Sequence, residues 1–303
     1  MESWIWIPIT LLAALVQAIR TAMQKQLTAG MGIEAVTLVR FLFGLPFAAA
    51  YLVALMVING YPLPELNLTF LGSCTAAAAA QIVATALLIQ LFSMRNFAVG
   101  TSYSRTEAFL TGLIGAAFFA EIIDPAGWVA IGISVIGVVV MTIAGRRVAG
   151  HSLMLFFTDR SMAIGLASGC GFALASLFIR RASLSLGHPD WLFSAAVTLV
   201  AIILLQTVTL GSYVALRQPG QYGAILRHWR ACVLVGLTSM LGSAGWFTAM
   251  TIERAAYVKA VGQIEFAFTL LASVYVFHER SSKLELAGML MVVIGIVVLL
   301  VYG

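Results

Sequence analysis

The chain has 303 residues, of which 61% are hydrophobic and only 10% are charged, and its formal net charge is +5. A soluble domain carries about 25% charged residues, because its core needs a polar shell. Here 17 Lys+Arg and 12 Asp+Glu would have to cover the whole surface. The composition therefore excludes an ordinary soluble protein and predicts an integral membrane protein whose surface lies against the lipid bilayer.

Long apolar runs follow one another along the chain, and each is close to the roughly 20 residues that a spanning helix needs. Turn residues such as Asn59-Gly60 and Pro189-Asp190 separate them. The runs are continuous instead of alternating, which excludes a transmembrane β-barrel. We predict an all-α protein with ten transmembrane helices, near 5–27, 33–58, 68–92, 97–120, 124–146, 161–184, 190–214, 230–251, 255–278 and 284–302.

The sequence repeats itself at a distance of 158 residues, so that 98–140 aligns with 256–298 without a gap. The most informative matches are Glu107 with Glu265 and Glu121 with Glu279, because acidic residues are rare in this chain. The first three helices of each half align more loosely. The pattern predicts two copies of a five-helix unit.

A unit with an odd number of spans must be followed by a copy of opposite orientation in the membrane. The expected organisation is a first repeat at 1–146, a linker at 147–160 and a second repeat at 161–303. Two inverted five-helix repeats are the architecture of many secondary transporters, with the substrate site near the membrane midplane between them.

Apart from Arg20, Arg40, Arg105 and Lys259, which lie deeper in the predicted spans, the basic residues lie in loops or near span ends and divide unevenly between the two faces. The face opposite the chain ends carries ten, whereas the face with both ends carries Arg180, Arg181 and Arg254. Because Lys and Arg are enriched in cytoplasmic loops, we expect both termini to be non-cytoplasmic. The short loops and tails favour a bacterial inner membrane.

Several charged residues fall inside the predicted spans, where each costs about 2.5–3.5 kcal/mol on insertion scales. Such residues normally face a wet cavity and are functional candidates by default. The alternative is that they form structural ion pairs between helices. The candidate substrate-binding residues are the charged Arg20, Arg105, Glu107, Lys259 and Glu265, together with Gln263, Tyr103 and Trp246.

Four glutamates are candidates for coupling or gating. Glu107 and Glu265 lie at membrane depth, each with a threonine four residues later whose hydroxyl could hydrogen-bond to the carboxylate. Glu121 and Glu279 lie at span ends beside polar turns, where they would cap or gate. Coupling to protons or to exchange is left open.

Motifs of catalysis and cofactor binding are absent from the sequence, including the metalloprotease, phosphate-loop, serine-hydrolase and Cys-x-x-Cys patterns. We therefore expect no enzyme activity, no cofactor and no metal. The three cysteines have no metal-ligand spacing. Excess basic charge in a membrane protein does not predict a nucleic-acid partner.

The ends of the two halves carry a resemblance to a known family. Each half has an apolar stretch closing on a glutamate, 116–121 and 274–279, followed by a glycine-bearing last helix with Ile136-Gly137 or Ile294-Gly295. This pattern is similar to the drug/metabolite transporter superfamily, in the form of a ten-helix member with two EamA-type domains. The resemblance implies an alternating-access carrier of small metabolites. Small four-helix relatives use a first-helix glutamate for proton coupling, whereas this chain has Gln17 and Arg20 there.

The leading hypothesis is a secondary active transporter of a small metabolite, an amino acid or another anionic or zwitterionic compound. Cations outnumber carboxylates at membrane depth, which favours a substrate with a carboxylate or phosphate. A multidrug or cation exporter is the alternative among transporters. A non-transporting membrane receptor, scaffold or lipid-handling protein is the alternative from another class. The sequence leaves the oligomeric state open.

Overall fold

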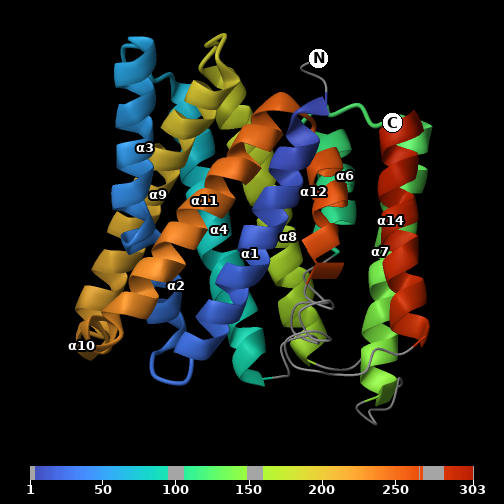
Figure 1. The fold of residues 1–303 in the computed structure, drawn as a ribbon. Coiled ribbons are helices and arrows are strands. Elements are labelled where there is room, and N and C mark those ends of the chain that lie inside the picture. The colour runs from blue at the N-terminus through green and yellow to red at the C-terminus, as the bar shows by residue number, and fades with distance from the viewer. Residues whose placement is uncertain (1–3, 95–105, 149–159, 266, 269–282, 303) are drawn as a thin grey trace.

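The computed structural model describes residues 4–94, 106–148, 160–265, 267–268 and 283–302, and within them all regular structure is helical. The helices form an upright bundle (Figure 1). They are α1 (Trp6–Leu27), α2 (Ile33–Leu42), α3 (Gly44–Asn59), α4 (Leu68–Met94), α6 (Glu107–Phe118), α7 (Pro125–Val148), α8 (Arg160–Ser185), α9 (Trp191–Arg217), α10 (Gly220–Arg227), α11 (Trp229–Ile252), α12 (Ala255–Gly262) and α14 (Lys283–Tyr302).

Every predicted span contains a described helix, and the all-α prediction is confirmed for the described residues. In the described part of the chain, six segments are long and apolar enough to cross a membrane, namely α1, α2 together with α3, α4, α8, α9 and α11. Shorter apolar helices occupy Glu107–Phe118, Pro125–Gly137 and Leu286–Leu299. Parts of 97–120 and 255–278 lie outside the described residues, so the count of ten spans stays a prediction.

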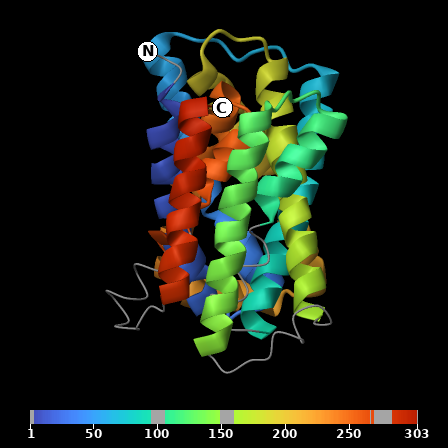
Figure 2. The ribbon, with the colours of Figure 1, turned by 90° about the vertical axis from the view of Figure 1, so that its right-hand side faces the viewer.

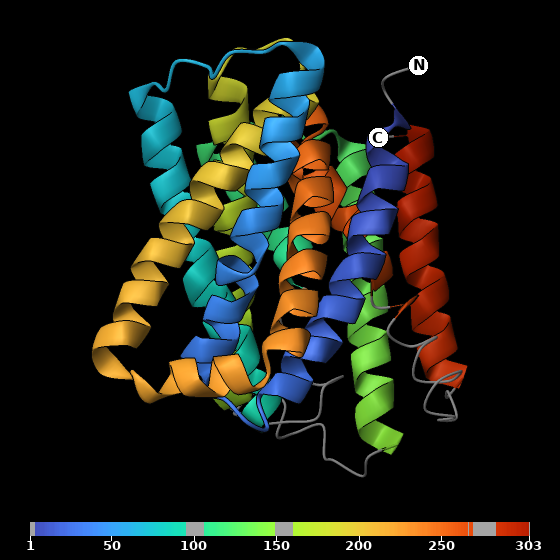
Figure 3. The ribbon, with the colours of Figure 1, turned by 60° about the vertical axis from the view of Figure 1, so that its left-hand side comes forward.

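Neighbouring helices in the bundle come from distant parts of the sequence. α7 packs against α14 along one edge, where the two stand side by side in Figure 2. α1 packs against α11, as Figure 3 shows in blue and orange, and α4 packs against α8. α6 lies between α8 and α12, and α12 also contacts α1. The central helices therefore alternate between the N-terminal and C-terminal halves of the chain.

The two ends of the bundle differ in what they carry. Both chain ends lie at one end (Figure 1), together with the corners 119–124 and 252–255. We call this the terminal face. Helix capping is visible here: the Asp190 carboxylate accepts hydrogen bonds from the backbone N–H groups of Leu192 and Phe193 and so begins α9. The α9–α10 and α10–α11 corners lie on the opposite face.

Glycines allow α7 and α14 to approach closely. A Cβ added to Gly137 on α7 would lie 2.7 Å from the carbonyl oxygen of Gly288 on α14. A Cβ added to Gly295 on α14 would lie 2.8 Å from the carbonyl oxygen of Ala130 on α7. Both would strike backbone, so the helices would have to move apart. Small residues at such crossings are typical of helices that pack within lipid.

Candidate functional site

A cavity of about 40 Å³ lies inside the bundle, enclosed by α1, α2, α4, α6, α8, α11 and α12. One wall is apolar and comes largely from α8 and α11. The charged and amide groups of the lining are Gln17, Arg20, Arg40, Gln81, Glu107, Lys259 and Glu265. These groups come from both halves of the chain. The cavity therefore gathers most of the predicted intramembrane charges at a single place.

An ion pair joins the two halves inside the cavity. The Lys259 Nζ on α12 lies 2.5 Å from the Glu107 Oε1 on α6, and both side chains are largely buried. The same ammonium lies 4.5 Å from the centre of the Trp246 ring on α11, a cation–π geometry. Gly262 lets this ring lie against α12, because a Cβ there would meet the indole. Lys259 is thus held by a carboxylate and an aromatic face.

A second polar group links α1 to the segment after α12. The Gln17 Nε2 donates a hydrogen bond of 2.8 Å to Glu265 Oε2. Glu265 is 3% exposed and also acts electrostatically on Arg20. Arg20 is 3% exposed too, yet its Nε and Nη1 have no hydrogen-bond partner among the described residues. Buried donors without partners are costly, which marks Arg20 as an unusual residue.

Two further polar contacts brace the cavity wall. The Arg40 Nη1 on α2 donates a hydrogen bond of 2.9 Å to the Thr85 hydroxyl on α4. The Gln206 Nε2 on α9 donates a hydrogen bond of 2.7 Å to Oε1 of Gln81, a residue of α4 that lines the cavity. These bonds link adjacent helices across the interior, where each polar side chain needs a partner in place of water.

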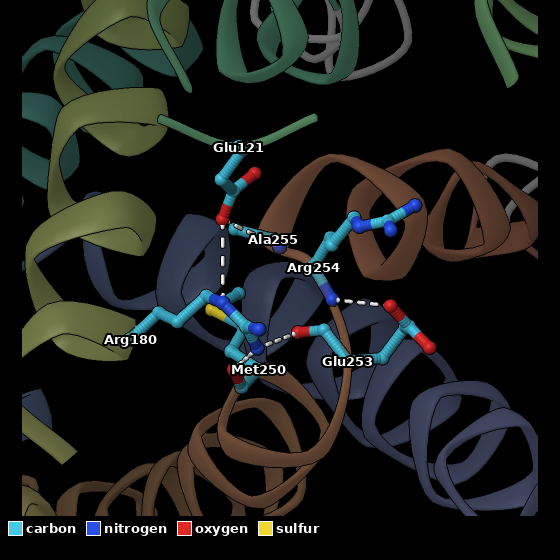
Figure 4. Close-up of polar contacts among 6 residues, drawn as sticks. All are labelled: Glu121, Arg180, Met250, Glu253, Arg254 and Ala255. Carbon is cyan, nitrogen blue, oxygen red and sulfur yellow. Dashed lines mark hydrogen bonds and ion pairs between the residues drawn. The ribbon is translucent and has the colours of Figure 1, made fainter. Parts of the chain in front are cut away.

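The terminal face holds a second charged cluster, which links the α6–α7 corner to the α11–α12 corner (Figure 4). Glu121 Oε1 lies 3.4 Å from the Nε of Arg180 on α8 and accepts a hydrogen bond of 3.2 Å from the Ala255 backbone N–H. The Arg180 Nη1 donates to the carbonyl oxygens of Met250, at 2.6 Å, and Glu253. Glu121 therefore caps α12, with Arg180 bridging the two corners.

A more exposed contact extends this cluster. The Tyr257 hydroxyl donates a hydrogen bond of 2.6 Å to Asp124 Oδ2. Asp124 Oδ1 accepts a hydrogen bond from the Gly127 N–H at the start of α7. The Arg254 guanidinium lies 4.0 Å from Asp124. We call Glu121, Asp124, Arg180, Arg254 and Tyr257 the terminal clasp. Burial raises the pKa of Glu121, and this effect exceeds the opposing effects of the Ala255 N–H and of Arg180.

The predicted site residues are distributed as follows. Arg20, Glu107, Lys259, Glu265 and Trp246 line the cavity. Gln263 is buried and lines a small adjoining pocket with Gln17, Glu107, Lys259 and Glu265. Glu121 belongs to the terminal clasp. The remaining candidates, Tyr103, Arg105 and Glu279, lie outside the described residues.

Sequence reasoning missed part of the site. The sequence places Arg180 with the cations of the face that carries both chain ends, whereas the structure shows a partly buried member of the clasp. The sequence marks Gln17 only as the residue that stands in place of a glutamate, and its hydrogen bond to Glu265 spans 248 residues. The Thr111 hydroxyl bonds to the backbone carbonyl of Glu107, 2.7 Å away, and not to its carboxylate. Among the described residues, no group of three His, Cys, Asp or Glu side chains is placed to hold a metal ion.

Comparison with known proteins agrees with this picture. The EamA-like transporter family matches residues 160–301, so the second half carries an EamA domain. With the apolar helices, this match supports a membrane protein of the drug/metabolite transporter superfamily. A solved structure described only as "Crystal structure of protein" is 16% identical, with a TM-score of 0.70 over 100% of this chain and 99% of the other. That likeness concerns the fold alone. No curated protein matches the sequence.

Proposed function

We propose that this protein is a secondary active transporter that carries a small metabolite by alternating access. The observation that carries the proposal is the buried cavity, whose charged groups come from both halves of the chain. Intramembrane charges are expensive and are kept where they serve a substrate or ion pathway. The EamA match over residues 160–301 supports the same function.

The packing of α7 and α14 supports the proposed inverted repeat. Gly137 and Gly295 are equivalent under the 158-residue shift, and so are Ala130 and Gly288. Gly137 approaches Gly288, while Gly295 approaches Ala130. A reciprocal contact of this kind is what a two-fold axis between two helices produces. α7 and α14 are antiparallel, since the earlier residue of each helix meets the later residue of the other. A two-fold axis that relates two antiparallel spanning helices is perpendicular to them, so it would lie in the membrane plane.

Two further helix contacts are also related by the proposed two-fold axis. The contact of α4 with α8 corresponds to that of α11 with α1, if α1–α4 is matched to α8–α11. Small residues mark both crossings, with Gly171 against Ala84 and Gly245 against Ala13. Gly171 and Ala13 are 158 residues apart, whereas Gly245 and Ala84 are 161 apart, because the first three helices of each half align more loosely. This agreement supports repeats at 1–146 and 161–303 joined by a linker at 147–160.

The cavity size suggests how a transport cycle would proceed. About 40 Å³ accommodates a few water molecules and is far too small for a metabolite. A substrate would enter only when one face of the bundle opens. On the terminal face the clasp around Glu121 and Arg180 would be the gate. Glu279 is equivalent to Glu121 by the shift and is our candidate for the opposite face. Glu107 and Glu265 are candidates for proton coupling, and exchange is the alternative.

The described cavity charges favour an anionic or zwitterionic substrate. Three cations, Arg20, Arg40 and Lys259, face two carboxylates, Glu107 and Glu265. A lipophilic cation exporter would need unpaired acids instead. From the excess of Lys and Arg on the opposite face we place the terminal face outside the cytoplasm, in a bacterial inner membrane. A reporter fused to Gly303 that is active only in the cytoplasm would contradict this orientation.

Ligand screening followed by flux measurement tests the transporter proposal. The purified protein would be screened by thermal shift against a metabolite library, and binders would then be tested for flux in proteoliposomes. Ligands that bind the native state raise the melting temperature. We expect binders to cross the membrane, and flux to fall when Lys259→Ala removes a cavity charge. Ligands that bind without flux would favour the receptor, scaffold or lipid-handling alternative.

A further inference from the structure

The three described cavity cations differ in how their nitrogens are used. Lys259 is paired with Glu107 at 2.5 Å and lies over Trp246. Arg40 donates to the Thr85 hydroxyl at 2.9 Å. Among these three, Arg20 alone has fully buried nitrogens, Nε and Nη1, without a hydrogen-bond partner in the described part of the chain. A buried guanidinium normally has hydrogen-bond partners for its N–H groups, and Arg20 is only 3% exposed, so its hydrogen bonding is incomplete.

The charges around Arg20 lead to the same conclusion as its hydrogen bonding. Its electrostatic partner is Glu265, whose Oε2 already accepts a hydrogen bond from Gln17. Arg40 is close enough to repel it. Among the described cavity residues, three cations and two carboxylates leave one positive charge uncompensated. An anion beside Arg20 would supply both the missing acceptors and the missing charge.

We propose that Arg20 binds the oxyanion head, a carboxylate or a phosphate, of a small organic anion with an apolar body. The inference rests on the proposed transport function and narrows its substrate class. The apolar body would lie against the α8–α11 wall, formed by Phe172, Ile179 and Phe247. The Trp246 Nε1 also lacks a partner in the described residues and offers a second donor.

A zwitterion fits this arrangement less well than a simple anion. An ammonium group would need a carboxylate with capacity to spare. Glu107 already holds Lys259, and Glu265 holds Gln17 while compensating Arg20. A positive substrate group would therefore have to displace a cation that the protein itself supplies. The charge balance selects a ligand with net negative charge.

A series of probes with one skeleton and different heads tests the proposal. The probes are 3-phenylpropanoate, 2-phenylethyl phosphate, phenylalanine, 2-phenylethylamine and 3-phenylpropanamide, and binding to the purified protein is measured by thermal shift and thermophoresis. We expect one or both anions to bind at least about tenfold more tightly than the zwitterion, amine and amide. The two anions distinguish a carboxylate site from a phosphate site.

Variants show whether Arg20 is responsible. We expect Arg20→Gln to weaken anion binding at least about tenfold, because a charged hydrogen-bond donor is lost. Arg20→Lys should give an intermediate loss, since the charge stays but the planar donor set is gone. Arg181→Gln removes an exposed cation from α8 and should bind like the wild type. If Arg20→Gln is unstable, Arg20→Gln/Glu265→Gln removes the pair together and should fold while still binding the anion weakly.

Three results would overturn the inference. They are tighter binding of phenylalanine or the amine than of both anions, wild-type anion affinity in the Arg20 variants, or no binding of either anion at millimolar concentration. All three are binding measurements, so they leave the flux test of transport untouched. Flux of a ligand that is not anionic would support transport and overturn only the role given to Arg20.

Discussion

Lys259 on α12 and Glu107 on α6 form an ion pair with 2.5 Å between Nζ and Oε1, and each residue comes from a different half of the chain. The two side chains are only 12% and 16% exposed, so neither charge is well solvated. The pair ties the two halves together at the cavity. A transporter that moves one half against the other would have to strain or rearrange this contact.

We expect single neutralisations of this pair to destabilise the protein more than a double one. Lys259→Met or Glu107→Gln leaves a buried charge without its partner, which costs about 3–5 kcal/mol in proteins. The double variant Lys259→Met/Glu107→Gln removes both charges and should recover most of the lost stability. Melting temperatures in detergent would measure this, and additive losses would show that the two side chains do not interact.

The pH dependence of stability should carry a contribution from Glu121. Burial raises the pKa of Glu121 above its ordinary value of 4.5, so the folded protein holds this proton more tightly than the unfolded chain. Its contribution is therefore fully present below about pH 4.5 and is lost as the pH rises through the folded-state pKa. We expect the melting-temperature difference between wild type and Glu121→Gln to shrink as the pH rises from about 4.5 through the folded-state pKa of Glu121. A difference that grows with pH would mean that the Arg180 pair dominates instead.

The reciprocal contact of α7 and α14 predicts matched effects at two positions. Gly137→Ala and Gly295→Ala each place a Cβ against the backbone of the facing helix. Each should lower the melting temperature by a similar amount, corresponding to about 1–3 kcal/mol of overpacking. The double variant should lose less than the sum, because the first substitution already separates the helices.

Gly132→Ala on α7 is the matched control for this pair, since a Cβ there meets nothing within 4 Å. It should be neutral or slightly stabilising, because alanine favours the helix more than glycine does. A large loss in only one of Gly137→Ala and Gly295→Ala would argue against a two-fold relation between the helices.

Much of the fold could be predicted because lipid imposes simple rules on sequence. A run of about 20 apolar residues is almost forced to be a helix in a bilayer, and turn residues mark its ends. The 158-residue shift also identified Gly137 and Gly295 as equivalent, and these glycines meet the facing helix in matching ways. The break at Phe43, between α2 and α3 inside a single predicted span, was not foreseen.

The partners of the charged residues were harder to predict than their depth. Hydropathy alone predicts that Arg20, Glu107, Lys259 and Glu265 lie at membrane depth. Which cation pairs with which carboxylate depends on helix rotation and crossing, and no local pattern encodes these. Gln17 and Arg180 were missed for this reason, since their partners Glu265 and Glu121 are remote in sequence.

Alternating exposure of the cavity is the most direct test of the account. Ser176 lies in the cavity wall and is 2% exposed, so we would introduce Ser176→Cys after replacing Cys74, Cys170 and Cys232 with alanine. Membrane-impermeant maleimide would be applied from each side of sealed vesicles. Leu63→Cys, in the segment that joins α3 to α4 at the terminal face, and His228→Cys, at the α10–α11 corner on the opposite face, report which side is exposed.

We expect Ser176→Cys to react from both sides, and Arg180→Gln, which breaks the terminal clasp, to speed the reaction from the terminal face and slow it from the other. Reaction from one side only, unchanged by Arg180→Gln, would contradict alternating access and favour a receptor or scaffold with a fixed pocket.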